Sequence, residues 1–191
     1  MDRNKQIYTM VLTSLLIAVG IVIPMISPIK IIIEPASFTL ASHVAIMIAI
    51  FISPIAAISV AVGTTIGFFL AGFPIAVVLR ALSHVIWAGI GAYYAKKYPN
   101  TFQSPLKTII FNIVIACIHG VCEMIIVLPF YTGMEASSFI YMVFGLVGLG
   151  TVIHSFIDFS ISLIVWNALS KSKSIANIAT VKKVNLIKKY I

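Results

Sequence analysis

The sequence predicts an all-α membrane protein, folded as one bundle of six transmembrane helices, from its composition and its hydrophobic pattern. Of its 191 residues, 61% are hydrophobic and only 9% are charged, and the mean hydropathy is +1.12. A soluble domain averages about 25% charged residues, so this chain could not cover its core with a polar surface. Its apolar residues also lack the alternation that transmembrane β-strands show. We therefore expect a polytopic helical membrane protein.

Six apolar segments divide the chain, and we expect a helix in each of them. They cover residues 7–27, 38–53, 55–72, 74–95, 107–130 and 138–169. A span needs about 20 residues, so two segments are short, and the last is long enough to tilt or to include an interfacial turn. The second and third segments are separated at Ser53-Pro54, and the third and fourth at residues 71–74, where proline and glycine interrupt helices.

Both ends of the chain carry basic residues. The N-terminal segment starts like a signal peptide, but its apolar run is too long, and Pro24 follows without a small-residue cleavage site. We read it as a retained first span, so that residues 1–191 form a single domain. The tail from about 171 to 191 is expected to be solvated or bound to lipid headgroups, and a docking helix is the alternative.

The distribution of basic residues predicts the orientation in the membrane. With six spans, eleven of the 13 Lys and Arg residues fall on one side, namely Arg3, Lys5, Lys96, Lys97, Lys107 and six lysines after residue 170. The positive-inside rule then places both ends in the cytoplasm and the loops 28–37, 71–74 and 131–137 outside. The net charge of +8 accordingly points to anionic lipid rather than to nucleic acid.

Polar residues form stripes inside the apolar segments, and these stripes predict the functional site. Three segments each carry two ionisable side chains four residues apart, which places both on one helix face. The pairs are Arg80 and His84, His119 and Glu123, and His154 and Asp158. Trp87 lies near the first pair, and Asn112 shares the face of the second. Ionisable groups in lipid cost free energy unless they are paired or hydrated, so three such pairs indicate a site.

Residue numbering predicts how two of these pairs meet. Antiparallel neighbours at equal depth have residue numbers with a constant sum, and Arg80 with Glu123 gives the same sum as His84 with His119. If the two helices adjoin, arginine meets glutamate in the outer half and histidine meets histidine further in. The expected pocket opens outward. The alternative is that Arg80 and Glu123 simply neutralise each other and lock two helices together.

Other candidates have weaker support from the sequence. Glu34 is a further candidate for the site, with an exposed loop acid as the alternative, and His43 at a helix start is expected only to cap or anchor that helix. The spacing of Cys117 and Cys122 indicates neither a disulfide nor a metal pair. The sequence contains no phosphate-binding loop, HExxH motif or GxSxG elbow, so we expect no enzyme, no cofactor and no metal.

Three stretches of the sequence resemble a known family. EPASFTLASHVAIMIAIFISP, GTTIGFFLAGFP and VLRALSHVIWAGIGA, together with the chain length and the cytoplasmic basic ends, resemble the S components of energy-coupling factor transporters, and more specifically the niacin-type members. These are substrate-binding subunits of prokaryotic cell membranes. In that family a first-helix A-x-x-x-A motif supports docking to the T component. The matching stretch here is SLLIA, with Ser14 in place of the first alanine and Ala18 as the second.

The resemblance implies binding of a vitamin from outside, followed by association with a T component and two ATPase subunits that use ATP. Nicotinate has a carboxylate, a flat ring and a ring nitrogen. Arginine suits the carboxylate because its planar fork donates two parallel hydrogen bonds. We therefore expect Arg80 to hold the carboxylate, His84 to contact the ring or its nitrogen, Glu123 to orient Arg80, and Trp87 to stack on the ring.

Two other functions remain as alternatives from the sequence. The chain could bind another small vitamin. It could also be a self-sufficient secondary transporter whose proton relay uses His119, Glu123, His154 and Asp158. Six spans without a visible repeat count against the secondary transporter.

Overall fold

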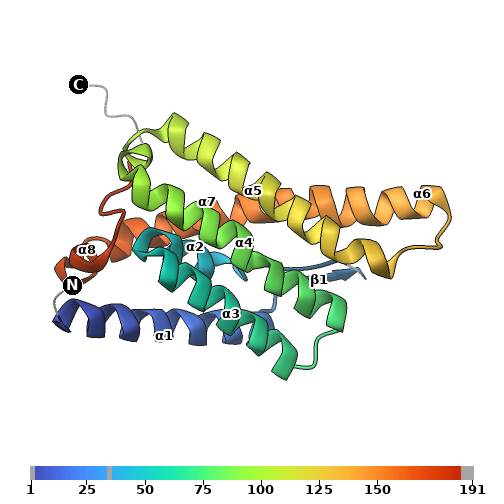
Figure 1. Ribbon diagram of the computed structural model, residues 1–191, viewed down its shortest axis with the longest axis horizontal. Helices are drawn as coiled ribbons and strands as arrows, with labels where there is room; N and C mark the ends of the chain where they lie inside the picture. The colour runs from blue at the N-terminus through green and yellow to red at the C-terminus, as the bar shows by residue number, and fades with distance from the viewer. Residues whose placement is uncertain (1–2, 34–35, 186–191) are drawn as a thin grey trace.

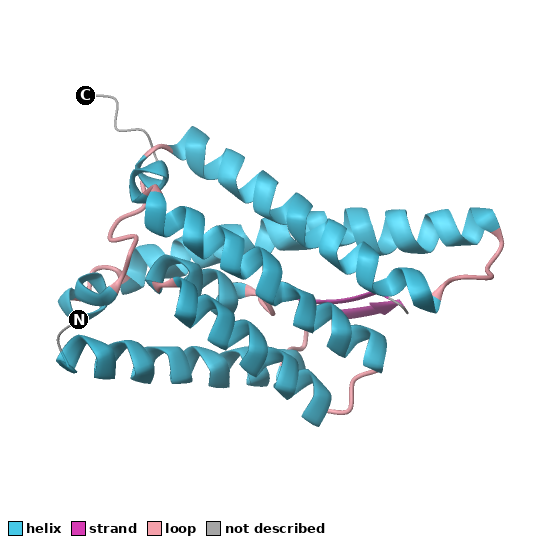
Figure 2. Ribbon diagram, in the orientation of Figure 1, coloured by secondary structure: helices cyan, strands magenta, loops and turns pink. Residues whose placement is uncertain are grey.

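The computed structural model describes residues 3–33 and 36–185, and in this part of the chain it is a helical bundle with one small β-hairpin (Figures 1 and 2). The elements in order are α1 (Arg3–Ile26), β1 (Lys30–Ile33), β2 (Ala36–Thr39), α2 (Val44–Ile52), α3 (Pro54–Leu70), α4 (Ile75–Lys97), η1 (Pro99–Gln103), α5 (Pro105–Val127), η2 (Leu128–Phe130), α6 (Ala136–Phe139), the π-helix η3 (Ile140–Leu149), α7 (Gly150–Leu169) and α8 (Lys173–Ile178). The all-α class is confirmed, and all six predicted segments contain a helix.

The prediction of six spanning helices is confirmed only in part. Within the described residues, four helical segments are long and apolar enough to cross a membrane, namely Arg3–Ile26, Ile75–Lys97, Pro105–Phe130 and Ala136–Leu169. Pro54–Leu70 is a shorter apolar helix. The segment 38–53 is not a span, because α2 has nine residues and rises about 14 Å, roughly half of the hydrocarbon thickness.

The short helix α2 forms the centre of the bundle. All nine of its residues are buried, and it contacts α1, α3, α4 and α7. Its side chains are apolar on every face, which suits a helix that neighbours surround completely. Such a helix has no exposed side, so its unpaired backbone groups at both ends need partners from the protein itself.

Residues after α8 provide the partners at the C-terminal end of α2. The backbone N–H of Thr180 donates to the carbonyl of Ile52 at 3.2 Å, and that of Val181 donates to Phe51 at 3.0 Å. Val181 is itself buried, and its carbonyl accepts from the indole N–H of Trp166 at 3.1 Å. This part of the basic tail therefore packs into the bundle, whereas we expected a tail that is solvated or bound to lipid headgroups.

The β-hairpin was not predicted, because the sequence indicated only an outward loop at 28–37. β1 and β2 are antiparallel, with Ile31 opposite Phe38. Phe38 packs against a small buried cluster of Val127, Val143 and Val147, and so fixes the hairpin to α5 and η3. The hairpin lies toward the end of the bundle that also carries α6, opposite the N-terminus and α8 (Figure 1).

Glycines bring two pairs of helices into close contact. A side chain at Gly63 or Gly67 of α3 would meet Ile17 or Ile21 of α1 at about 2.5 Å, so the GxxxG spacing marks close packing here. A Cβ at Gly120 of α5 would lie 3.0 Å from the carbonyl oxygen of Gly148. This second approach brings α5 against η3 and the start of α7, where the polar residues of the two helices meet.

Candidate functional site

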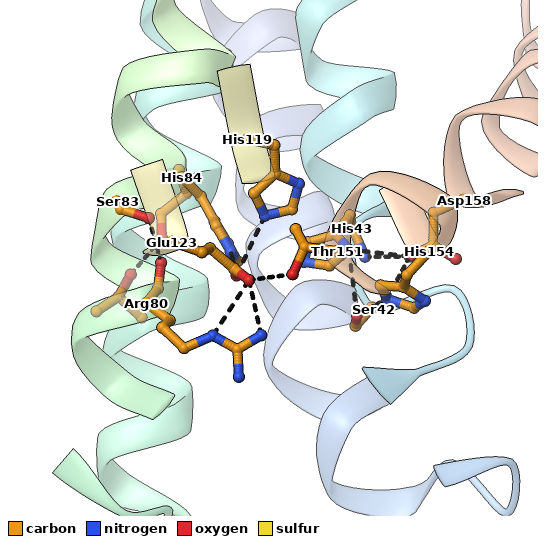
Figure 3. A network of polar contacts seen from close by, with 12 residues as sticks. Ser42, His43, Arg80, Ser83, His84, His119, Glu123, Thr151, His154 and Asp158 are labelled. Carbon is orange, nitrogen blue, oxygen red and sulfur yellow. Dashed lines mark hydrogen bonds and ion pairs between the residues drawn. The ribbon is translucent and has the colours of Figure 1, made fainter. Parts of the chain in front are cut away.

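A buried polar network connects the three helices that carry the ionisable pairs (Figure 3). Glu123 of α5 lies at its centre and is only 3% exposed. Its Oε2 accepts from Arg80 Nη2 at 2.7 Å and from Arg80 Nε at 3.1 Å, and it also accepts from the hydroxyl of Thr151. Its Oε1 lies 3.2 Å from the Nε2 atoms of both His84 and His119. The two carboxylate oxygens therefore face different partners.

The antiparallel register predicted from the sequence is confirmed by these contacts. α4 and α5 are neighbours, Arg80 pairs with Glu123, and the rings of His84 and His119 lie 4.8 Å apart between centroids. The regular rise of the helix makes this possible, since each turn of α4 meets the corresponding turn of α5. An ion pair at this depth also reduces the cost of burying each charge.

A second carboxylate, that of Asp158 on α7, organises the start of α2. Its Oδ1 accepts from the backbone N–H of Ala41 at 2.8 Å, and its Oδ2 accepts from the backbone N–H of His43 at 3.0 Å. Asp158 Oδ2 also lies 3.1 Å from His43 Nδ1 and 3.3 Å from His154 Nε2. A carboxylate at a helix N-terminus accepts hydrogen bonds from the unpaired N–H groups of the helix and interacts favourably with the helix dipole.

The backbone just before α2 is strained. Ala41 has a φ of 67°, a left-handed conformation that residues with a Cβ rarely adopt. This turn aims the N–H groups of Ala41 and His43 at Asp158 and directs the His43 ring into the network (Figure 3). Strained backbone of this kind is found at binding sites, where the surrounding structure holds it in place.

His43 is the residue that sequence reasoning undervalued. We expected it only to cap or anchor its helix, and its side chain makes no capping hydrogen bond. Its ring lies instead 4.7 Å from those of His84 and His119 and 4.9 Å from that of His154, between centroids. The available signal was that His43 is the one ionisable residue between Glu34 and Arg80.

A small cavity opens beside this network. Its volume is about 20 Å³, enough for roughly one water molecule. It is lined by Ser37, Thr39, Ser42, His43, Phe68, Val77, Arg80, Ala81, His84, Glu123, Thr151 and His154. These residues come from β2, the turn before α2, the end of α3, the first half of α4, α5 and the start of α7, and the contribution of β2 places the cavity beside the hairpin.

The predicted site residues fall into three groups. Arg80, His84 and Glu123 line the cavity, whereas Trp87 and His119 lie behind it with their rings 4.8 Å apart. Outside the cavity, Asp158 holds the start of α2, and Asn112 donates to the carbonyl of Phe156 at 3.3 Å, which connects α5 to α7. Glu34 lies outside the described residues.

Two sets of side chains have the atom types and the spacing to hold a metal ion. The ligand atoms of His43, His84, His119 and Glu123 lie within 4.8 Å of one another, as do those of His43, His154 and Asp158. The sequence indicated no metal, because each set combines segments that are far apart along the chain and the four-residue spacings of His119 with Glu123 and of His154 with Asp158 match no ligand motif.

One curated relative shows the family. The niacin transporter NiaX of Lactococcus lactis subsp. cremoris (strain MG1363) is 39% identical to this chain over 175 residues, which cover 89% of this chain and 78% of the relative. The chain belongs to the niacin-type S components of energy-coupling factor transporters. No family model matches the chain. No solved structure matches it either.

Membership of this family agrees with the resemblance in the sequence. The S component described here is a multi-pass membrane protein of a transport system. The stretches that carry the resemblance contain part of the buried network, namely His43, Arg80 and His84, whereas Glu123 and Asp158 lie outside them.

Proposed function

We propose that this S component binds niacin, as the nicotinate anion, from the outside of a prokaryotic cell. A T component and two ATPase subunits then drive its import with ATP. One observation carries the proposal: a buried arginine faces a cavity that three histidines and a glutamate also line. The printed name of the relative, niacin transporter, supports the same ligand.

The carboxylate of nicotinate is assigned to Arg80. In the structure, the Nε and Nη2 atoms of Arg80 both hold Oε2 of Glu123, so the planar guanidinium already binds a carboxylate. A ligand carboxylate would either bind Arg80 together with Glu123 or replace Glu123 there. Glu123 would keep Arg80 oriented while the site is empty. His84, one turn further along α4, would then face the ring of the ligand.

Binding requires the cavity to widen. A space for one water molecule cannot take a pyridine ring, and ligand pockets are usually several hundred Å³. The lining of the cavity contains Phe68, whose ring lies 4.8 Å, between centroids, from the tilted ring of Phe73 in the connection from α3 to α4. We assign the opening movement to this connection and to the hairpin, because Phe68 of α3 and Ser37 and Thr39 of β2 line the cavity.

The first prediction concerns Arg80. Charge-assisted hydrogen bonds contribute roughly 1.5–3 kcal/mol each, so Arg80→Gln is expected to weaken nicotinate binding at least about tenfold. Arg80→Lys retains the charge but loses the planar fork, so its binding should also be impaired. Calorimetry with nicotinate and with uncharged nicotinamide measures both effects. The wild type should prefer the acid, and Arg80→Gln should lose that preference.

Folding of each Arg80 variant is checked by gel filtration and thermal unfolding in detergent. Nicotinate binding of wild-type strength in a folded Arg80→Gln protein would show that Arg80 is only a structural partner of Glu123. The proposed site would then be wrong.

The second prediction concerns docking of the T component. Ser14 and Ala18 are both exposed on α1. Two leucines there should block close helix approach and abolish vitamin uptake by the assembled transporter, while nicotinate binding by the isolated subunit stays intact. The matched control places leucines at Cys117 and Val121, an exposed pair of the same spacing on α5. Unchanged uptake by the Ser14/Ala18 variant would exclude this surface.

The same uptake assay separates the proposal from a proton-coupled transporter. Vesicles that contain the S component alone should take up no nicotinate under a proton gradient, and vesicles with the T component and both ATPases should do so with ATP. Uptake by the S component alone would favour a proton relay through His119, Glu123, His154 and Asp158.

The third prediction concerns orientation. The N-terminus and α8 lie at one end of the bundle, and α6 lies at the other (Figure 1). Basic residues at the first end support a cytoplasmic position for it under the positive-inside rule. In a chain with both native cysteines replaced by serine, an impermeant thiol reagent outside the cell should label Ser137→Cys and spare Ser172→Cys; both positions are exposed. The reverse labelling pattern would place the cavity on the cytoplasmic side, where it could not bind a vitamin from outside the cell.

A further inference from the structure

Three histidine rings surround a common point in the polar network. The centroid separations are 4.7 Å for His43 and His84, 4.7 Å for His43 and His119, and 4.8 Å for His84 and His119. The rings meet edge to face, at angles of 77°, 82° and 86°. Rings that share a tetrahedral metal, with bonds of about 2.0–2.1 Å, have centroids about 5 Å apart. The triangle observed here is close to that arrangement.

The fourth corner is an oxygen of Glu123. Its Oε1 lies 3.2 Å from His84 Nε2 and 3.2 Å from His119 Nε2. Ligand atoms around a tetrahedral zinc ion are separated by about 3.3 Å, given the same bond lengths. All four ligand atoms lie within 4.8 Å of one another, so small side-chain rotations would bring them to one ion.

The residues behind these ligands support a metal site. His43 Nδ1 faces Asp158 Oδ2 at 3.1 Å, which leaves His43 Nε2 for the ion. A carboxylate that accepts from the second nitrogen of a histidine ligand is a common partner in metal sites, where it fixes the ring orientation. Glu123 is held in the same way, because Arg80 and Thr151 bind its other oxygen, Oε2.

Charge balance leads to the same assignment. With neutral histidines, Arg80, Glu123 and Asp158 together carry one negative charge. A divalent cation and one nicotinate anion would bring the total to zero, and a neutral cluster is the least costly to bury in a membrane.

We propose that His43, His84, His119 and Glu123 hold one divalent transition-metal ion of the zinc type, and that the ring nitrogen of the bound vitamin is a further ligand of this ion. The second part rests on the proposed function. Imidazole and pyridine are both aromatic nitrogen donors, so a metal that three histidines bind also suits the ring of nicotinate. Arg80 and the proposed ion share one cavity wall, so carboxylate and ring nitrogen are recognised from the same side.

The test uses Co²⁺, whose visible absorption reports its ligands. The protein carries an affinity tag without histidine and serine at Cys117 and Cys122, so that neither a tag nor a thiol binds the ion. After removal of metal with a chelator, one Co²⁺ per chain should bind and give tetrahedral bands. His84→Ala and His119→Ala should lose these bands. Ser162→Ala should keep them, because this buried α7 hydroxyl only donates to the carbonyl of Phe159.

The ligand is then varied at one atom. Nicotinate should change the Co²⁺ bands, whereas benzoate, which has a carbon in place of the ring nitrogen, should not. Chelation should weaken nicotinate binding, measured by calorimetry, by at least about tenfold.

The outcomes separate this proposal from the proposed function. Nicotinate binding of equal strength with and without metal would overturn the metal site and leave nicotinate recognition by Arg80 standing. Bands that stay unchanged while calorimetry shows bound nicotinate would overturn the ring-nitrogen bond. Absence of nicotinate binding in both metal-loaded and stripped protein would refute the proposed function. Absence of one histidine-dependent Co²⁺ per chain would refute the metal site.

Discussion

Replacing Asp158 with alanine is expected to destabilise the protein by at least about 3 kcal/mol, because three hydrogen bonds to a charged group are lost and each contributes roughly 1.5–3 kcal/mol. The Asp158 side chain is fully buried and accepts from two backbone N–H groups and from His43 Nδ1. Alanine would leave these donors without their acceptor at the start of α2, a helix whose nine residues are all buried. The strained turn at Ala41 would also lose the contact that holds it.

Denaturant titration of the purified protein in detergent measures this loss in the free energy of unfolding. Asp158→Asn should be strongly destabilised as well, because an amide nitrogen would face the N–H groups of His43 where an oxygen now accepts. Ser160→Ala is the matched control on the same helix, since its hydroxyl donates only to the carbonyl of Phe156 one turn earlier. Losses below about 1 kcal/mol in both Asp158 variants would show that this carboxylate does not hold α2.

α2 also shows where prediction from the sequence ended. Hydropathy located the apolar residues 44–52 correctly, but it could not distinguish a short buried helix from part of a span, because both are apolar on every side. The difference depends on distant partners. Asp158 lies more than a hundred residues after α2, and Thr180 and Val181 lie further still. No local pattern carries such contacts.

The candidate site also contains one part that the sequence could predict and one part that it could not. The pairing of Arg80 with Glu123 could be predicted, because regular helices convert residue spacing into depth. The position of His43 could not, since it precedes its helix and belongs to no periodic stripe. The π-helix η3, which leads into α7 and Thr151, also changes the helical register, so the depth of the α7 residues could not be derived from spacing.

Removing the Glu123 carboxylate while Arg80 remains is expected to reduce both the stability of the fold and nicotinate binding. Glu123→Leu would leave a buried guanidinium without its carboxylate, and Thr151, His84 and His119 would each lose a partner. A loss of about 3–5 kcal/mol follows from the uncompensated charge. The variant should also bind nicotinate more weakly, because Arg80 would lose the carboxylate that orients it.

A double variant separates the charge effect from the packing effect. Arg80→Met combined with Glu123→Leu removes both charges and keeps apolar volume, so it should be more stable than Glu123→Leu alone, as replacement of whole buried ion pairs by hydrophobic residues often is. The double-mutant cycle, measured by the same denaturant titration, should give an interaction energy of about 1–3 kcal/mol between the two side chains. An energy near zero would mean that the 2.7 Å contact between Arg80 and Glu123 contributes little to the fold. In that case the Arg80 guanidinium would not depend on Glu123 for its place in the cavity, and the orienting role assigned to Glu123 would be wrong.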